Sequence, residues 1–305
     1  MPPDGLLVID KPAGLTSHDV VQRVRRAFEI KRVGHGGTLD PDATGVLLVA
    51  LGQATRFFPF LSKAEKSYEG RIRLGFSTDT YDGSGRPASE ESPERPGRDA
   101  IAAAMARLEG RILQAPPPFS AKKVGGKPAY KLARAKEEFS LKPSEVTVRA
   151  FRLVSYEDPF VAFEAECSAG TYVRSLAHDL GRDLGCGAHL VALRRTAVGP
   201  YVLADAVTLE KLESPAPEVS AANFLVPLED LLPEVPAVQV GPEAAARVLN
   251  GSPLAPSHLT PGPPARLPFP AEAPVVRLIG PTGRLLALAR PSPDGAALLP
   301  FLVLS

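Results

Sequence analysis

The segment HGGTLDPDATG, His35–Gly45, places one carboxylate, Asp40, among glycines, threonines and a proline. Gly36 and Gly37 permit left-handed backbone and close approach by a ligand. Pro41 fixes its own φ and pushes Asp40 towards extended geometry. Because nothing in this stretch continues a helix or an ordinary strand, we predict that Asp40 lies on a rigid turn at the edge of the core. An Asp-Pro pair by itself indicates only a turn, so the neighbouring sequence has to decide its role.

Regular elements are predicted on both sides of this turn. Val46–Leu51 is typical of a buried strand, and Leu6–Asp10 of another. Thr16 and Asp19 form a capping-box pattern at the start of an amphipathic helix. The apolar face of that helix consists of Val20, Val21, Val24 and Phe28, and its outer face carries Arg23, Arg25 and Arg26.

The central part of the chain mixes further strands and helices. Tyr68–Leu74 alternates strictly, with Tyr68, Gly70, Ile72 and Leu74 on one face. Residues 79–98 are polar and rich in turn formers, which predicts a surface loop. The remaining predicted elements are a helix at Ile101–Leu108, a strand at Val161–Cys167 and a helix at Val173–Leu184. This succession predicts an α+β protein.

The last third is divided by prolines. Residues 214–236 indicate an exit from the main domain, and a short helix is predicted over Val240–Asn250. Ser252–Pro274 contains eight prolines, which predicts irregular structure. Three strands then follow, Val275–Ile279, Leu285–Ala289 and Ala297–Leu304, and they indicate a compact β unit.

Composition sets broad limits on the function. A chain of 305 residues with 44% apolar content can bury a sizeable core and divide into one large and one small domain. Cys167 and Cys186 lie in apolar patterns typical of core thiols, and the five histidines show no ligand spacing, so we expect no disulfide and no metal. Neither a signal peptide nor a membrane-spanning segment is predicted, which favours a cytoplasmic protein.

Charge is unevenly distributed although the net charge is only +1. Residues 1–150 carry 24 Lys and Arg against 18 Asp and Glu, whereas residues 151–305 carry 11 against 16. Basic clusters lie at Arg23–Arg32 and Lys122–Lys136. Charge runs are often simply solvated, but the second cluster also contains Gly125, Gly126 and Tyr130, which suits an arm that grips phosphates.

Five sequence blocks resemble, in order, the motifs of pseudouridine synthases. The first two are GLLVIDKPAG at Gly5–Gly14 and the Asp40 segment. PPPFSAKKVGGKPAYKLAR at Pro116–Arg134 resembles a stretch of the bacterial TruB branch, the tRNA pseudouridine-55 synthases. SAGTYVRS at Ser168–Ser175 and GAHLVALRR at Gly187–Arg195 resemble the last two motifs.

The resemblance implies a fold, a division into domains and an activity. The expected fold is the pseudouridine synthase fold, a mixed, largely antiparallel sheet flanked by helices. Residues 1–232 would form the catalytic domain with a basic arm inserted at about 119–145, and 237–305 a small PUA-like domain. The implied activity is isomerisation of uridine-55 in the T loop of tRNA, with base flipping and no cofactor. We expect a monomer that needs no protein partner.

The resemblance also implies roles for particular side chains. Asp40 matches the family nucleophile, which has to be ionised, and Arg174 matches its cationic partner. Tyr68 matches the tyrosine that stacks on uracil, and His35 the histidine that occupies the space left by the flipped base. Lys11 is expected to support the Asp40 loop. The other expected substrate contacts are Tyr172, Leu193, Lys122 and Lys123.

Three alternatives remain at this stage. A tRNA-binding folding factor would use the same surfaces without chemistry. A metal-dependent phosphohydrolase would use Asp40 and Asp42 as an Asp-x-Asp pair, although the sequence offers no further clustered carboxylates. A guide-RNA-dependent relative is the third, and the arm at Pro116–Arg134 favours the stand-alone bacterial type over it.

Overall fold

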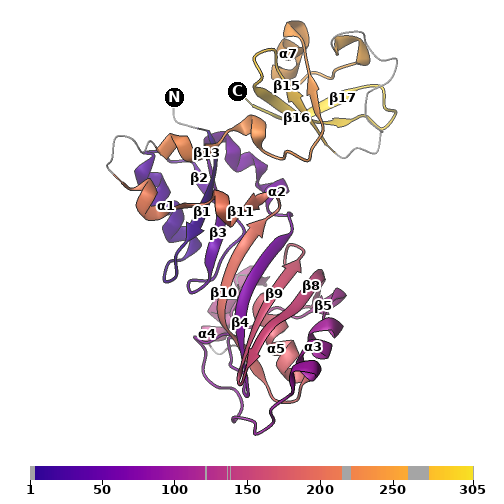
Figure 1. The fold of residues 1–305 in the computed structure, drawn as a ribbon. Helices are drawn as coiled ribbons and strands as arrows, with labels where there is room; N and C mark the ends of the chain where they lie inside the picture. The colour runs from indigo at the N-terminus through magenta and orange to yellow at the C-terminus, as the bar shows by residue number, and fades with distance from the viewer. Residues whose placement is uncertain are drawn as a thin grey trace.

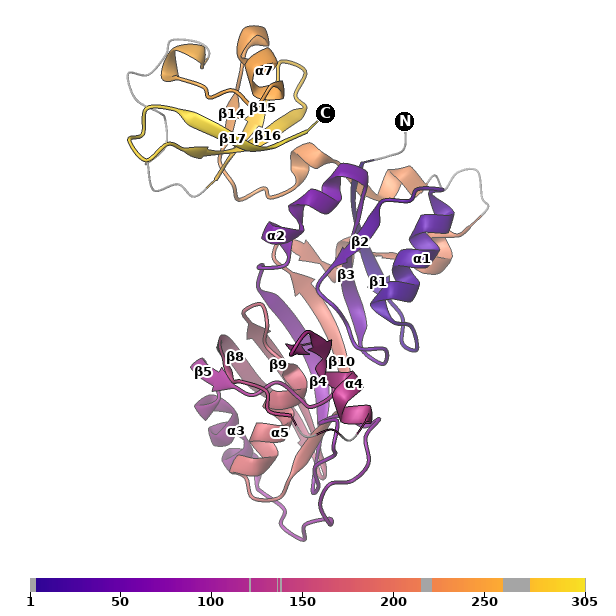
Figure 2. The same cartoon turned by 180° about the vertical axis from the view of Figure 1, so that it is seen from behind.

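The computed structural model describes residues 4–120, 122–135, 137, 139–214, 221–259 and 275–304. Its main body is built on one sheet of eleven strands, with the strand order β12-β1-β3-β10-β4-β9-β8-β5. β2 also pairs with β3, β11 with β10 and β13 with β1. A separate four-stranded sheet, in the order β14-β15-β16-β17, lies next to the N-terminal half of the main body (Figures 1 and 2). The predicted α+β class with a mixed, largely antiparallel central sheet is therefore confirmed.

The N-terminal half begins with β1 (Gly5–Lys11), α1 (Ser17–Ala27), β2 (Val33–Gly36) and β3 (Thr44–Leu51). The predicted capping box is confirmed: the Thr16 side chain accepts a hydrogen bond from Asp19 N, and the Asp19 carboxylate accepts one from Thr16 N at 2.9 Å. Helix α1 buries its valine face against β1 and β3, as the periodicity predicts.

Two details of the Asp40 segment differ from prediction. His35 and Gly36 belong to β2, so the irregular part of the segment is shorter than expected. Gly37 is left-handed, with φ of 89°, as predicted, whereas Gly36 is not. Glycine is favoured at this strand position because a Cβ there would crowd the Phe58 ring at 3.2 Å.

The second half contains the long strands of the sheet. These are β4 (Lys66–Leu74), β5 (Gly110–Gln114), β8 (Ser144–Glu157), β9 (Phe160–Cys167) and β10 (Ala188–Val198). Helices α3 (Arg98–Arg107) and α5 (Val173–Asp183) cover one face of it. The alternation predicted for β4 and β9 is confirmed, and the sequence did not predict β5, β8 and β10 as strands.

Strand β10 connects the two halves of the sheet. It pairs with β4 along most of its length and, through Arg194 and Arg195, with Thr44 and Gly45 of β3. Gly45 has φ of 96°, and a Cβ on it would overlap the carbonyl of Arg195. Only glycine allows the start of β3 to approach β10 this closely.

Shorter elements complete the main body. The inserted arm contains β6 (Lys123–Val124), β7 (Lys127–Pro128) and α4 (Ala129–Arg134). After β3 come η1 (Gly52–Phe57) and α2 (Phe58–Leu61). After β10 come β11 (Tyr201–Val202), η2 (Leu203–Asp205), β12 (Val207–Thr208), α6 (Leu209–Leu212), η3 (Ala221–Phe224), β13 (Leu225–Val226) and η4 (Leu228–Asp230).

The C-terminal unit consists of β14 (Ala237–Gln239), α7 (Pro242–Leu249), η5 (Pro256–His258), β15 (Val276–Ile279), β16 (Leu285–Pro291) and β17 (Leu298–Val303). The three predicted strands are confirmed. The proline-rich stretch was predicted to be irregular. Its described part contains one 3₁₀ turn, η5, and residues 260–274 lie outside the described residues. Val275, Ile279 and Leu288 pack in one cluster with Leu6 and Phe57, so the small sheet shares a core with the main body.

No helix among the described residues is both long and apolar enough to cross a membrane.

We predict that Gly181→Ala destabilises the protein. Gly181 lies in α5, where alanine is normally better than glycine by about 1 kcal/mol. Here a Cβ would overlap the backbone of Gly187 and Ala188 at the start of β10, and such overpacking costs about 1–3 kcal/mol. Urea unfolding monitored by circular dichroism measures the change.

Gly97→Ala is the matched control, since Gly97 precedes α3 and a Cβ there meets nothing within 4 Å. An equal effect of the two substitutions would contradict the proposed close contact between α5 and β10.

Candidate active site

Two side chains fix the backbone on either side of Asp40. The Ser17 hydroxyl, from the first turn of α1, accepts a hydrogen bond from Leu39 N at 2.9 Å and lies 3.2 Å from Leu39 O. The fully buried Lys11 ammonium, from the end of β1, donates to Pro41 O at 2.9 Å and also to Pro12 O and Leu15 O. The predicted supporting position of Lys11 thus agrees with its contacts, and Asp40 lies between two anchored residues.

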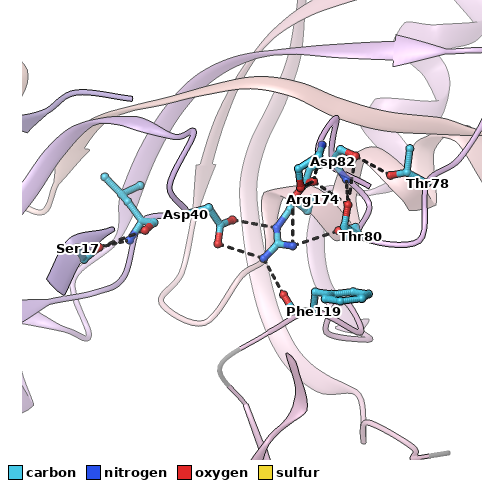
Figure 3. Close-up of polar contacts among 9 residues, drawn as sticks. Ser17, Asp40, Thr78, Thr80, Asp82, Phe119 and Arg174 are labelled. Atoms are coloured by element: carbon cyan, nitrogen blue, oxygen red, sulfur yellow. Dashed lines mark hydrogen bonds and ion pairs between the residues drawn. The ribbon is translucent and has the colours of Figure 1, made fainter. Parts of the chain in front are cut away.

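The Asp40 carboxylate is held by one edge of the Arg174 guanidinium, the edge formed by Nε and Nη2. Nε of Arg174 lies 2.9 Å from one carboxylate oxygen, and Nη2 donates to the other at 3.2 Å (Figure 3). The arginine side chain is only 8% exposed, whereas that of Asp40 is 44% exposed. The pair therefore has a rigid cation behind a carboxylate that a substrate can reach.

A second acid, Asp82, holds the same arginine from the opposite side. Nη1 of Arg174 lies 3.2 Å from the Asp82 carboxylate and donates to Thr80 O at 3.1 Å. Nη2 donates to Phe119 O, at the base of the arm, at 3.2 Å. Figure 3 shows Asp40 on one side of Arg174, and Thr80 and Asp82 on the other. Sequence reasoning missed Asp82, because TDTYDGSG has the composition of an ordinary surface turn.

Opposing effects act on the ionisation of Asp40. Burial raises the pKa of Asp40 above its ordinary value, Arg174 opposes that rise, and the charge of Asp82 adds to it. Arg174 thus provides the fixed cation that keeps the carboxylate available in its charged form.

Tyr68 projects from β4 at the position that pairs with Arg195 of β10. Burial raises the pKa of the Tyr68 phenol, so the hydroxyl remains protonated at neutral pH. Arg195 is 1% exposed and donates from Nε to Val46 O at 2.7 Å and from Nη2 to Gly37 O at 3.2 Å. It thereby joins β10 to the Asp40 segment. Arg195 was not predicted as a site residue, although it ends the block Gly187–Arg195.

Two further predicted residues lie in the surrounding framework. Leu193 of β10 is partly buried and packs against core clusters of both halves of the sheet. Tyr172 immediately precedes α5, and its backbone N donates to Gln114 Oε1 at 2.8 Å while its carbonyl accepts from Gln114 Nε2 at 3.1 Å. The buried Gln114 therefore fixes the start of the helix that carries Arg174.

His35 is half-buried in β2, and its Nδ1 is buried without a hydrogen-bond partner among the described residues. Burial lowers the pKa of His35, and the positive charge of Arg195 lowers it further. The imidazole is therefore neutral at neutral pH.

The two predicted lysines are not part of this contact network. Lys122 donates to Lys142 O at 3.2 Å and to the Ser144 hydroxyl, and so ties the start of the arm to its end. The side chain of Lys123 lies outside what the structure describes. Within the described ranges, no group of three or more His, Cys, Asp or Glu residues is placed to hold a metal ion.

Family models match most of the main body. Residues 25–173 match the N-terminal domain of TruB family pseudouridylate synthase. Residues 174–233 match the tRNA pseudouridylate synthase B C-terminal domain.

Curated relatives agree with these matches. The chain is 48% identical over 248 residues to tRNA pseudouridine synthase B of Solibacter usitatus, covering 81% of this chain and 85% of that protein. It is 44% identical over 289 residues to tRNA pseudouridine synthase B of Burkholderia pseudomallei, covering 95% and 93%.

Solved structures extend the similarity to nearly the whole chain. An H/ACA ribonucleoprotein bound to a substrate RNA containing 2'-deoxyuridine contains a chain that is 26% identical, with a TM-score of 0.73, covering 99% of this chain and 85% of that one. A Cbf5-Nop10-Gar1 complex gives 27% identity and the same TM-score, covering 99% and 84%. With its motifs in order, its fold shared with these structures and close to half of its residues identical to curated members, the chain belongs to the TruB family of pseudouridylate synthases.

Proposed function

We propose that the chain is an isomerase that converts uridine to pseudouridine at position 55 in the T loop of tRNA. The observation that supports this most directly is the partly exposed Asp40 carboxylate held by the buried Arg174. The relatives from Solibacter usitatus and Burkholderia pseudomallei, which bear the name tRNA pseudouridine synthase B, support tRNA as the substrate.

The reaction breaks the N1–C1′ bond of the uridine, turns the base and joins C5 to C1′. C5 loses a proton and N1 gains one, so the net composition does not change. It is redox-neutral and consumes no other reactant, so we expect no cofactor. Asp40 would act as the nucleophile or stabilise the developing positive charge at C1′. Arg174 would orient Asp40, and the anchors on Leu39 and Pro41 would limit its movement during the reaction.

The residues around Asp40 would hold the base. Tyr68 would stack on the uracil, with Tyr172 and Leu193 as further contacts. Since its phenol is protonated in the free protein, Tyr68 would be a hydrogen-bond donor before it could accept a proton. His35, which is neutral and has an unpaired Nδ1, would occupy the place of the flipped base.

The arm and the small domain would bind more distant parts of the tRNA. We propose that Lys122, Lys123 and their basic neighbours grip phosphates of the T arm, which the enzyme would recognise mainly by shape. We place the catalytic domain at 1–232 and a PUA-like domain at 237–305, where the four-stranded sheet would contact the acceptor side. We further propose that the protein acts in the cytoplasm as a monomer.

The alternatives explain less of the geometry. A folding factor would not need a buried arginine paired to a loop aspartate, although both activities can coexist. In a metal-dependent phosphohydrolase the ion would compete with Arg174, which already occupies both Asp40 oxygens. The higher identity to bacterial tRNA enzymes than to the ribonucleoprotein structures favours the stand-alone type.

Asp40→Asn is predicted to abolish isomerisation while leaving tRNA binding within about twofold of wild type, since affinity comes mainly from phosphate and shape contacts. The amide has a similar size but cannot act as a nucleophile. The test incubates each protein with an unmodified tRNA transcript, without any cofactor, and maps pseudouridine. Substantial turnover by pure Asp40→Asn protein would show that Asp40 is not the nucleophile.

The single-turnover rate should fall on the acid side of neutral pH at a higher pH than an ordinary aspartate would give. Protonation removes the reactive carboxylate, and burial raises the pKa of Asp40, so the charged form is lost earlier as the pH decreases. His35 is the other group of the site that could titrate in this range. In the His35→Gln variant, the acid limb of the pH–rate profile should stay at the same pH. A rate that stays constant below the ordinary aspartate pKa of 3.8 would be inconsistent with this assignment.

Neutralising the arm with Lys123→Gln, Lys127→Gln and Lys131→Gln together is expected to weaken binding of all tRNAs similarly. Lys127 and Lys131 are exposed, and Lys122 is left in place because it ties the arm together. The slope of log affinity against log salt should decrease by about 2–3, since fewer counterions are released. Arg98→Gln, Arg107→Gln and Arg111→Gln change the net charge equally on the exposed α3–β5 surface and form the control. Equal slopes for the two triple variants in fluorescence titrations would rule out the arm as a phosphate-binding surface.

A further inference from the structure

Tyr81 has a backbone conformation that bulky residues rarely adopt. Its φ is 65°, in the left-handed region, where a side chain is disfavoured. Its two neighbours, Thr80 and Asp82, both bind Arg174, one through its carbonyl and one through its carboxylate. The left-handed turn at Tyr81 is thus located between two contacts to the same guanidinium.

The ring of Tyr81 stacks on His178. The ring centroids are 3.8 Å apart and the planes differ by 10°. His178 follows Arg174 by four residues on α5, so the two side chains lie one turn apart on the same side of the helix. Helix α5 therefore carries both Arg174 and His178, and the turn that contains the partners of Arg174 packs on His178.

The contact uses the face of the imidazole. Nδ1 of His178 is buried and has no hydrogen-bond partner among the described residues. Burial lowers the pKa of His178, which keeps the ring neutral at neutral pH. The turn is also tied to β10, because Tyr81 O accepts from Leu190 N at 3.0 Å and Gly83 N donates to Leu190 O at 2.8 Å. Stacking and strand pairing together support the strained turn.

We propose that Tyr81 and His178 are positioning residues: their stack holds Thr80 and Asp82 on Arg174 and so keeps Arg174 aligned with Asp40. The catalytic consequence rests on the proposed isomerisation, in which Arg174 orients the nucleophile. Small displacements of an aligned catalytic group reduce rates strongly. Among the described residues, no hydrogen bond, ion pair or ring contact joins the stack to Asp40 or to the expected base contacts, so its loss should act on the rate of the chemical step rather than on tRNA affinity.

The first test separates rate from binding. His178→Ala and Tyr81→Gly, of which the second keeps the left-handed backbone accessible, are expected to lower the single-turnover rate by about tenfold or more. The Kd for tRNA should stay within about twofold of wild type, because phosphate contacts set it. His178→Phe and Tyr81→Phe each keep an aromatic ring at the substituted position. Both variants should therefore retain most of the wild-type rate. Arg182→Ala, one turn further along α5 and 72% exposed, is the matched control.

The second test needs no turnover. Unfolding free energies of His178→Ala, Asp82→Asn and the double variant should be non-additive, whereas Arg182→Ala and Asp82→Asn should be additive. Wild-type rates in His178→Ala, or additivity of His178→Ala with Asp82→Asn, would overturn the proposal. If the wild-type protein forms no pseudouridine, the proposed function fails, and the unfolding cycle still decides whether the stack supports the Asp82–Arg174 contact.

Discussion

The ion pair between Asp40 and Arg174 is the interaction on which the rest of the site depends. Asp40 belongs to the N-terminal half and Arg174 to the second half, so the pair forms only when both halves are correctly joined. Several other polar contacts of the site support one of these two residues. Ser17 and Lys11 fix the backbone next to Asp40, and Thr80, Asp82 and Phe119 surround the guanidinium. Burying a cation among several oxygen acceptors makes its position strongly determined.

Local sequence patterns predicted a large part of the fold. The capping box at Thr16, the alternation of β4 and the apolar run of β3 all have short-range causes, and the structure confirms them. Strand β10 was not predicted as a strand, because its polar and charged residues, including Arg194 and Arg195, break the usual apolar pattern. Its β-structure comes from pairing with β4 and β3, which no local window contains.

The residues of the site also fall into those that the sequence could predict and those that depend on contacts distant in the chain. The sequence could single out Asp40 by its unusual loop, and the family resemblance paired it with Arg174. Asp82 escaped notice because its loop is composed like any exposed turn. Arg195 escaped because the partners that make it important, the carbonyls of Gly37 and Val46, are about 150 residues away in the chain. Spacing along the sequence carries no direct information about such contacts.

Because β10 connects the two halves of the sheet, the order of synthesis also matters. Asp40 and Arg174 are 134 residues apart, and β10 follows the arginine. At translation rates of about 5–20 residues per second, Asp40 is made roughly 7–27 seconds before Arg174 exists. During that time the nascent chain carries the Asp40 loop without its cation and without the strand that joins the two halves. The pairing of Asp40 with Arg174 is therefore completed only after α5 and β10 have been synthesised and folded against the N-terminal half.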